Sequence, residues 1–253
     1  EKYLRGIPVR KTLSREFEKL FRVDTAGVPD VRGTQYFFTA RKHNEECRVL
    51  YIQKGLHGKP RALLNPNKLS KSKRAFIAGW QVSRDGSMLA YGLSESANDK
   101  AFVHVLDVKT GTKTKDVIPA DLYPGSMAWK NDNSGFWYTR RTIDAPLSEI
   151  KFHRKVYFHR LGTNYTEDTL IFGKELKKED MPSLRTSHDE RFLLVTVHLR
   201  SGKDSQSEIY LYDAQNPKNG FVCVTRGVKG EFFGTMHRDM LYVHTNYKAP
   251  FWK

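Results

Sequence analysis

Apolar and polar residues alternate in short runs along most of the chain. Such runs, separated by clusters of Gly, Asn, Asp and Ser, are typical of half-buried β-strands joined by tight turns. The hairpin at Lys155–Phe172 is the clearest, because two alternating runs flank a loop rich in Gly, Thr and Asn. The expected strands are Tyr36–Arg41, Arg48–Gln53, Arg61–Leu64, Gly79–Val82, Met88–Ser94, Phe102–Val108, Lys115–Ile118, Ser126–Lys130, Gly135–Arg140, Val156–Leu161, Thr169–Phe172, Ser183–Thr186, Phe192–His198, Glu208–Asp213, Phe221–Thr225, Phe232–Met236 and Met240–Thr245.

An aspartate in a polar turn precedes one strand in each repeat after the first. These residues are Asp85, Asp132, Asp189 and Asp239, and their spacings are 47, 57 and 50 residues. A period near 50 with several short strands per unit indicates a β-propeller, in which each small antiparallel sheet packs against its neighbours. We therefore expect an all-β fold with about four and a half blades of a seven-bladed propeller. A large sandwich with evenly spaced strands is the alternative.

The first 34 residues follow a different pattern. Ser14 is expected to cap a short helix, Arg15–Phe21, which has Phe17, Leu20 and Phe21 on one face. The glycines and proline between Val23 and Gly33 predict an extended connection. The expected organisation is a lead-in at 1–34, able to pack on another domain, and a partial propeller at 35–253. The last repeat stops halfway, and we expect the chain to be a piece of a longer protein.

The chain is strongly basic. It has 43 Lys and Arg against 28 Asp and Glu, a formal charge of +15, which favours attraction to polyanions. The basic residues are spread along the chain, and only Lys68–Arg74 and Lys174–Lys178 form short clusters. A solvated basic surface is therefore favoured over a nucleic-acid groove.

Cysteine use and hydropathy suggest a cytoplasmic protein. Cys47 and Cys223 are far apart, so two reduced thiols are favoured over a disulfide. The mean hydropathy is −0.61, and no apolar run approaches the roughly 18 residues of a membrane span. The start of the chain does not resemble a secretory signal.

With the repeats assigned, the chain resembles the propeller of the prolyl oligopeptidase family of serine peptidases from about Phe17 to its end. The His-x-Leu-Gly-Thr hairpin and the Ala-Tyr-Gly-Leu-Ser strand carry most of the resemblance. The matching stretches are Val49-Leu50-Tyr51, Leu63–Asn67, Ser83–Gly86, Leu89–Ser94, Val105–Val108 with Thr110-Gly111, Met127-Ala128-Trp129, Gly135–Tyr138, His159–Thr163 and Glu167-Asp168.

This resemblance implies a seven-bladed propeller placed over an α/β-hydrolase domain. In that family the propeller limits access to short peptides, and the reaction is acyl transfer to a serine, after proline in the best-known branch. The hairpin and the Asn65-Pro66-Asn67 corner look more like this branch than like the branch specific for basic residues. The hydrolase domain would lie outside this chain, with short peptides as substrates.

We expect no catalytic residue, metal site or cofactor in the chain itself. No Gly-x-Ser-x-Gly nucleophile elbow occurs, and the nearest stretch, Gly92–Ser96, lacks the second glycine. Its Ser94 is therefore not expected to be a nucleophile. No histidine or cysteine spacing indicates a metal. Structural imidazoles are favoured for the histidines within strands, which are His104, His159, His198 and His244.

One residue is a candidate for contact with substrate. Arg200 falls where the resemblance implies an arginine on a propeller loop facing the active site, and a guanidinium there could bind a peptide carbonyl or carboxylate. A solvated surface arginine is the alternative. The sequence departs from the family pattern nearby, because Lys203 replaces a smaller residue. Tyr123-Pro124 stands where an aromatic side chain would come one position later.

The sequence is therefore compatible with two functions. The first is the propeller portion of a cytoplasmic serine oligopeptidase whose active site lies outside the chain. The second is a stand-alone propeller that binds peptides or a polyanion without catalysis.

Overall fold

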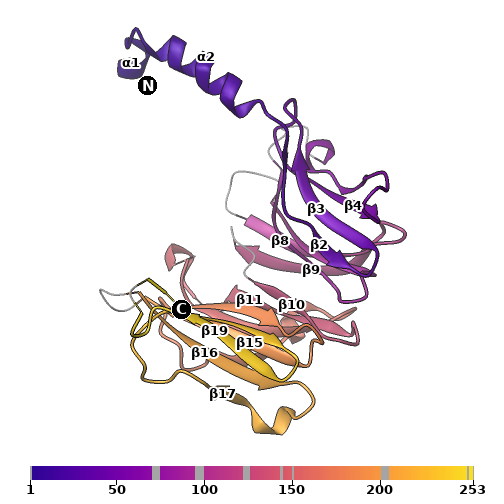
Figure 1. Cartoon of the computed structure of the whole chain (residues 1–253), viewed down its shortest axis with the longest axis vertical. Coiled ribbons are helices and arrows are strands. Elements are labelled where there is room, and N and C mark those ends of the chain that lie inside the picture. Colours follow the sequence, from indigo (N-terminus) through magenta and orange to yellow (C-terminus); the bar gives the residue numbers. More distant parts are fainter. Residues whose placement is uncertain are drawn as a thin grey trace. The chain divides into compact units, whose positions relative to one another are not determined.

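The computed structural model of the protein describes residues 2–69, 75–94, 100–121, 126–142, 145–149, 151–200, 205–249 and 251–252. Antiparallel strands dominate it, and helices are confined to the N-terminus and to short connecting turns (Figure 1). The chain divides into two compact units, residues 1–77 and residues 78–253.

The first unit holds the two α-helices and one sheet. The helices are α1 (Lys2–Arg5) and α2 (Arg10–Phe21). In the sheet, the strand order is β1-β3-β4-β5, and β2 also pairs with β3. The strands and the 3-10 turn are β1 (Thr25–Ala26), β2 (Asp30–Arg32), β3 (Gln35–Arg41), β4 (Val49–Lys54), β5 (Arg61–Leu64) and η1 (Pro66–Lys68). Two short strands of the lead-in thus pair with the first blade.

Helix α2 is longer than the sequence pattern indicated, and the prediction that Ser14 caps it is wrong. The helix begins at Arg10, and Val9 at the N-cap makes no side-chain capping hydrogen bond. Ser14 lies inside the helix because Arg10, Lys11 and Leu13 are good helix formers that extend it by about one turn. No residue of α2 is buried. Its apolar face is therefore exposed within the first unit, and Phe17, Leu20 and Phe21 are 53%, 69% and 67% exposed.

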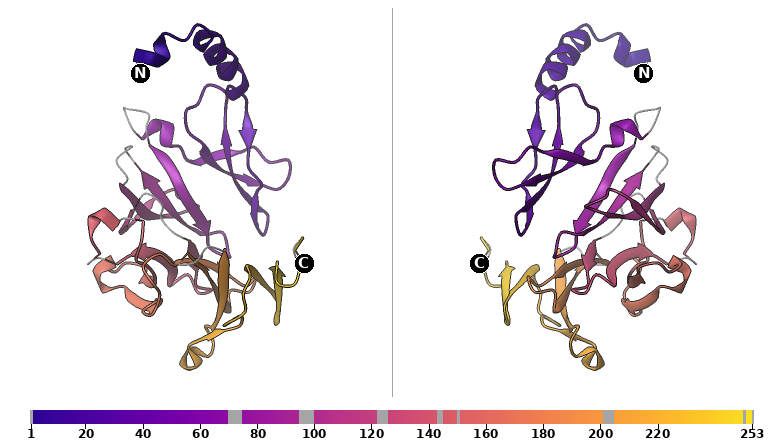
Figure 2. Two further views of the ribbon diagram at one scale, coloured as in Figure 1. Left: turned by 90° about the vertical axis from the view of Figure 1, so that its left-hand side faces the viewer. Right: turned by 90° about the vertical axis from the view of Figure 1, so that its right-hand side faces the viewer.

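The second unit repeats one motif, a four-stranded antiparallel sheet, which confirms the expected blades. Three such sheets have the simple orders β6-β7-β8-β9, β10-β11-β12-β13 and β14-β15-β16-β17, and β18-β19 is a two-stranded sheet. Figure 2 shows these sheets following one another along the chain. The strands are β6 (Phe76–Val82), β7 (Met88–Ser94), β8 (Lys100–Asp107), β9 (Lys113–Asp121), β10 (Met127–Trp129), β11 (Gly135–Arg141), β12 (Arg154–Arg160), β13 (Thr169–Phe172), β14 (Met181–Thr186), β15 (Phe192–Leu199), β16 (Gln206–Asp213), β17 (Phe221–Cys223), β18 (Phe232–His237) and β19 (Met240–Thr245). Short 3-10 turns are η2 (Leu147–Glu149), η3 (Tyr165–Glu167) and η4 (Pro217–Asn219).

Both faces of each inner sheet are buried, as propeller packing requires. On β11, Phe136 and Tyr138 join an apolar cluster with the preceding sheet, whereas Trp137 between them joins a cluster with β15. The same alternation on β15 places Leu193 towards the preceding sheet, β10-β11-β12-β13, and Leu194 towards β18. Continuous apolar runs in these strands therefore reflect burial on two sides.

The turn aspartates shape the turns that join the first two strands of the blades. Asp132 accepts hydrogen bonds from the backbone N–H and the hydroxyl of Ser134, at 3.0 and 2.6 Å. Asp85 and Asp189 accept from the backbone N–H two residues later in the same way. An aspartate in this position stabilises a tight turn through its side chain. The repeat seen in the sequence is thus a repeat of turn geometry.

Cys47 and Cys223 are free thiols. Within the described ranges, no helix is long and apolar enough to cross a membrane.

Candidate functional site

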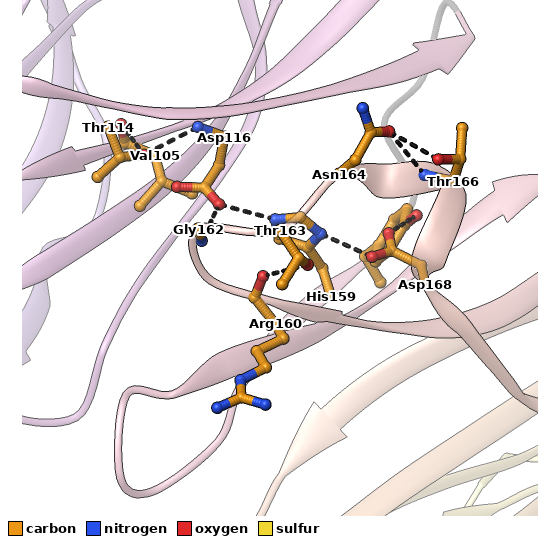
Figure 3. Close-up of polar contacts among 11 residues, drawn as sticks. Val105, Thr114, Asp116, His159, Arg160, Gly162, Thr163, Asn164, Thr166 and Asp168 are labelled. Carbon is orange, nitrogen blue, oxygen red and sulfur yellow. Dashed lines mark hydrogen bonds and ion pairs between the residues drawn. The ribbon is translucent and has the colours of Figure 1, made fainter.

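His159 is a buried histidine of the second unit with polar partners at both ring nitrogens. It lies on β12, where strand alternation turns it inward, and it is fully buried. Its Nδ1 is 2.7 Å from Asp168 Oδ1, and its Nε2 is 3.0 Å from Asp116 Oδ1 (Figure 3). Both ring nitrogens therefore face carboxylates.

The two carboxylates come from neighbouring blades. Asp168 lies just before β13, in the same sheet as His159, whereas Asp116 lies on β9 of the preceding sheet. Asp116 Oδ1 also accepts a hydrogen bond of 2.6 Å from the N–H of Gly162. This glycine has a φ of +82°, which the turn after β12 requires and which other residues rarely adopt. The His-x-Leu-Gly-Thr hairpin thus fastens one blade to the next.

The charges of this site balance only when the imidazole is protonated. A neutral ring has one donor nitrogen, so two carboxylate partners favour the imidazolium form. Burial opposes this form, but the hydrogen bonds and charges of Asp168 and Asp116 outweigh it and raise the pKa of His159. Burial likewise opposes ionisation of Asp116, yet hydrogen bonds from Thr114, Gly162 and His159 lower its pKa.

Aromatic side chains and an arginine complete the cluster. The Tyr138 hydroxyl donates a hydrogen bond of 2.6 Å to Asp168 Oδ2, and burial raises the pKa of Tyr138. Arg140 is only 7% exposed, and its guanidinium carbon lies 4.1 Å above the ring centroid of Tyr157. We refer to Asp116, His159, Asp168, Tyr138 and Arg140 as the interblade cluster. It holds two carboxylates against two cations.

The interblade cluster cannot perform base catalysis in this geometry. A general base needs a ring nitrogen with a lone pair directed at the group it deprotonates. Both nitrogens of His159 are engaged, and the ring is inaccessible to solvent. The expectation of a structural imidazole is thus met at His159.

The backbones of β11 and β12 pack closely beside His159. A Cβ atom on Gly135 would lie 2.1 Å from the carbonyl oxygen of His159. Only glycine allows β11 to approach β12 at this point.

Arg200 directly follows β15 and is exposed. Burial and the positive charge of Arg200 lower the pKa of His198, which lies two residues earlier in the same strand. Ser201 to Asp204, including Lys203, lie outside the described residues, as do Tyr123-Pro124. Arg200 therefore has an accessible guanidinium group directly after β15.

The other candidates from the sequence occupy structural positions. Ser94 is only 2% exposed at the end of β7, whereas a nucleophile needs access to substrate. His188 is exposed in one of the repeated turns, and His237 is the exposed last residue of β18. In the part of the chain that the structure describes, no group of three or more His, Cys, Asp or Glu side chains is arranged to hold a metal ion.

Sequence reasoning missed Asp116 as the partner of His159. Asp116 lies on the inward face of β9, the same face as Ile118, and it is 3% exposed. A carboxylate at an inward strand position is a signal for a buried cation, because an unpaired buried charge is unstable. The sequence did not reveal which cation, since the partner comes from another repeat.

Comparisons with known proteins agree with this architecture. The sequence model described as the prolyl oligopeptidase N-terminal β-propeller domain matches residues 1–253. A prolyl endopeptidase of Elizabethkingia meningoseptica is 28% identical over 98% of this chain and 35% of its own length. Protease 2 of Moraxella lacunata is 25% identical over 94% of this chain, again covering 35% of the relative. The chain thus spans about a third of these relatives.

Solved structures give the same result. A chain from a structural study of two prolyl endopeptidases superposes with a TM-score of 0.86 at 27% identity, over all of this chain and 37% of its own. Prolyl oligopeptidase B of Galerina marginata superposes with a TM-score of 0.78. At 19% identity the second match supports the fold alone.

Proposed function

Because the chain belongs to the family of the prolyl oligopeptidase N-terminal β-propeller domain, we propose that it is the propeller portion of a serine oligopeptidase. In this proposal the propeller limits access of short peptides to an α/β-hydrolase active site that lies outside the chain. The observation that carries it is the family match over the whole chain, joined to the series of four-stranded sheets. The relatives, about three times longer, include proteins named prolyl endopeptidase.

A filter for peptides must resist separation of its blades, and the packing supports that role. Interleaved aromatic and aliphatic side chains join neighbouring sheets, and Trp129 Nε1 donates a hydrogen bond of 2.9 Å to the carbonyl of Gln81 in the preceding blade. The interblade cluster adds charge-assisted hydrogen bonds, which are stronger than neutral ones. Folded proteins would then be excluded by size.

The proposed organisation keeps the division at residue 34. Residues 1–34 are a lead-in whose helix packs on the hydrolase domain of the same polypeptide, and 35–253 form the partial propeller. The exposed apolar side chains of α2 support this contact, because such a face is stabilised by burial against a partner. We place the protein in the cytoplasm, without membrane or nucleic-acid partners.

Arg200 is the proposed contact between propeller and peptide. Its exposed guanidinium can form paired hydrogen bonds to a peptide carbonyl or carboxylate. Replacing Arg200 with Gln should raise KM several-fold and change kcat little, because such a contact binds substrate and transition state alike. Arg160→Gln, another exposed arginine of the same unit, is the matched control.

The activity is tested with the full native polypeptide that carries this sequence. A short peptide with one internal proline should be cleaved after that proline, with loss of activity on treatment with a serine-reactive fluorophosphonate. The same segment placed inside a stable folded protein should remain intact. Absence of peptide cleavage, or equal cleavage of the folded protein, would contradict the proposal.

A further inference from the structure

A cavity of about 420 Å³ opens between the sheet β10-β11-β12-β13 and the sheet β14-β15-β16-β17. One wall comes from β13 and the loop that follows it, and the other comes from Tyr210 on β16 and Arg226 after β17. Its volume lies within the range of small-molecule sites in proteins. Both walls lie in the second unit, so the cavity is a feature of this unit alone.

The inner wall of this cavity is apolar and aromatic. The rings of Phe172 and Tyr210 meet edge to face, with centroids 4.8 Å apart, and Phe221 packs behind Phe172 at 4.7 Å. Leu176 is half-buried, whereas Leu170 is 41% exposed at the cavity. Such a surface favours a flat apolar group.

The loop that forms one wall is held in place by Lys155. The ammonium group of Lys155 donates hydrogen bonds to the carbonyl oxygens of Gly173, Lys174 and Leu176, the last two at 3.2 Å. Three carbonyl acceptors around one cation fix the loop before any ligand binds. A pocket that is already formed loses less entropy on binding than one that must order its loop.

Two exposed cationic side chains at the cavity can bind an anion. Lys174 and Arg226 are exposed there, against one carboxylate, Glu175. A second carboxylate, Glu208, accepts a hydrogen bond of 2.6 Å from the Tyr210 hydroxyl. The guanidinium of Arg226 is the group best suited to a carboxylate, because its planar donors match the two oxygens.

We propose that this cavity is a binding site for a small aromatic carboxylate, with the ring against Phe172 and Leu176 and the carboxylate at Arg226. The site is independent of the peptidase proposal. The same chemistry is offered by a free aromatic acid and by the C-terminal phenylalanine of a short peptide. We refer to this cavity as the seam pocket.

The test is a titration of the full native polypeptide with 3-(4-fluorophenyl)propionate, followed by fluorine NMR. We expect saturable broadening of the probe signal with a Kd of about 1 mM, as suits a ligand of this size. The neutral amide of the same acid should bind about tenfold more weakly, because it lacks the charge that pairs with Arg226. Absence of saturation up to about 20 mM, or equal binding of acid and amide, overturns the proposal.

Variants assign the binding to the seam pocket. Arg226→Gln should weaken binding of the acid about tenfold, whereas the exposed control Arg160→Gln should leave it unchanged. Glu175→Gln should tighten it about twofold, because it removes a nearby like charge. Thermal unfolding of each variant confirms that it is folded. Equal affinities for wild type and Arg226→Gln would place the probe elsewhere and overturn the proposal.

A competition experiment distinguishes the two possible ligands, a free aromatic acid and the C-terminus of a peptide. If N-acetylglycyl-phenylalanine displaces the probe and the C-terminal amide of the same peptide does not, a peptide C-terminus is a ligand of the seam pocket. Displacement by free aromatic acids alone identifies a small metabolite. Either result supports the carboxylate site, provided that Arg226→Gln weakens the displacing ligand as well.

Discussion

The side-chain amide of Asn133 donates a hydrogen bond of 2.9 Å to the carboxylate of Asp85, 48 residues earlier in the chain. Arg191 and Asp239, in the last two repeated turns, are also 48 residues apart, and their side chains lie 3.2 Å from each other. Turns that are equivalent in the repeat thus contact each other between neighbouring blades. The turn sequence therefore stabilises the turn itself and the contact between blades.

The first prediction concerns Asn133, which has a φ of +54°. Asn133→Gly removes the hydrogen bonds to Asp85 and Ser87 but tolerates this backbone conformation, and it should lower the free energy of unfolding by about 1 kcal/mol. Asn133→Ala should cost about 1 kcal/mol more, because its Cβ is strained in the left-handed region. Urea unfolding of the native polypeptide measures both, with the exposed neighbour Asn131→Gly as control. Identical stability of the two Asn133 variants would refute the role of the backbone.

The second prediction ranks the two partners of Arg191. Its guanidinium makes paired contacts of 2.9 and 3.3 Å with Asp213, whose side chain is 17% exposed, and a single contact with Asp239, which is 83% exposed. Paired geometry and lower exposure strengthen an ion pair, and solvent and salt weaken an exposed one. Double-mutant cycles with Arg191→Gln should therefore give a larger coupling free energy with Asp213→Asn than with Asp239→Asn. The reverse order would mean that the contact between blades is the stronger one.

The third prediction is a pH dependence caused by His159. A raised pKa in the folded protein means that the stabilisation is complete below the ordinary histidine value of 6.5 and is lost as the pH rises through the folded pKa. The lowered pKa of Asp116 acts in the opposite direction. Its stabilisation is complete above 3.8 and is lost as the pH falls through the folded value. Unfolding free energies should therefore be highest between these limits and fall on the alkaline side.

A variant isolates the histidine. His159→Phe leaves two buried carboxylates without their cation and should cost about 3 kcal/mol or more near pH 6. The difference between wild type and this variant should shrink as the pH rises above 6.5. His188→Gln, in an exposed turn, should leave the wild-type profile unchanged. A wild-type profile that stays flat on the alkaline side would contradict a protonated His159.

The sequence predicted the strands of this fold well because each strand carries a local signal. Alternation and turn aspartates located β7, β13 and β19 with their observed bounds. The helix start was wrong because capping by Ser14 is a weak preference, and the good helix formers before it extend α2 to Arg10.

Long-range partners could not be predicted in the same way. His159 was recognised as structural, but its contact with Asp116 spans 43 residues and depends on how two blades pack. The seam pocket likewise combines Tyr210 with a loop more than thirty residues earlier. No periodicity in a single sequence encodes which side chains of different repeats meet.

The last prediction concerns Thr139 on β11, whose hydroxyl is buried and has no hydrogen-bond partner among the residues that the structure describes. Burying a hydroxyl without a partner costs about 1 kcal/mol or more, whereas a methyl group of the same shape has no such cost. Thr139→Val should therefore raise the free energy of unfolding by about 1 kcal/mol. The Trp137 face of the same strand packs against β15, so an apolar group suits this environment.

Thr225 provides the matched control, because the same substitution there should have the opposite sign. Its hydroxyl oxygen accepts a hydrogen bond of 2.9 Å from the backbone N–H of Ile209, which is fully buried. Thr225→Val would leave that N–H without a partner and should lower the free energy of unfolding by about 1–2 kcal/mol. Urea unfolding of both variants decides the question. Destabilisation by Thr139→Val equal to that by Thr225→Val would mean that the Thr139 hydroxyl has a partner after all, and a bound water would then be the group to look for.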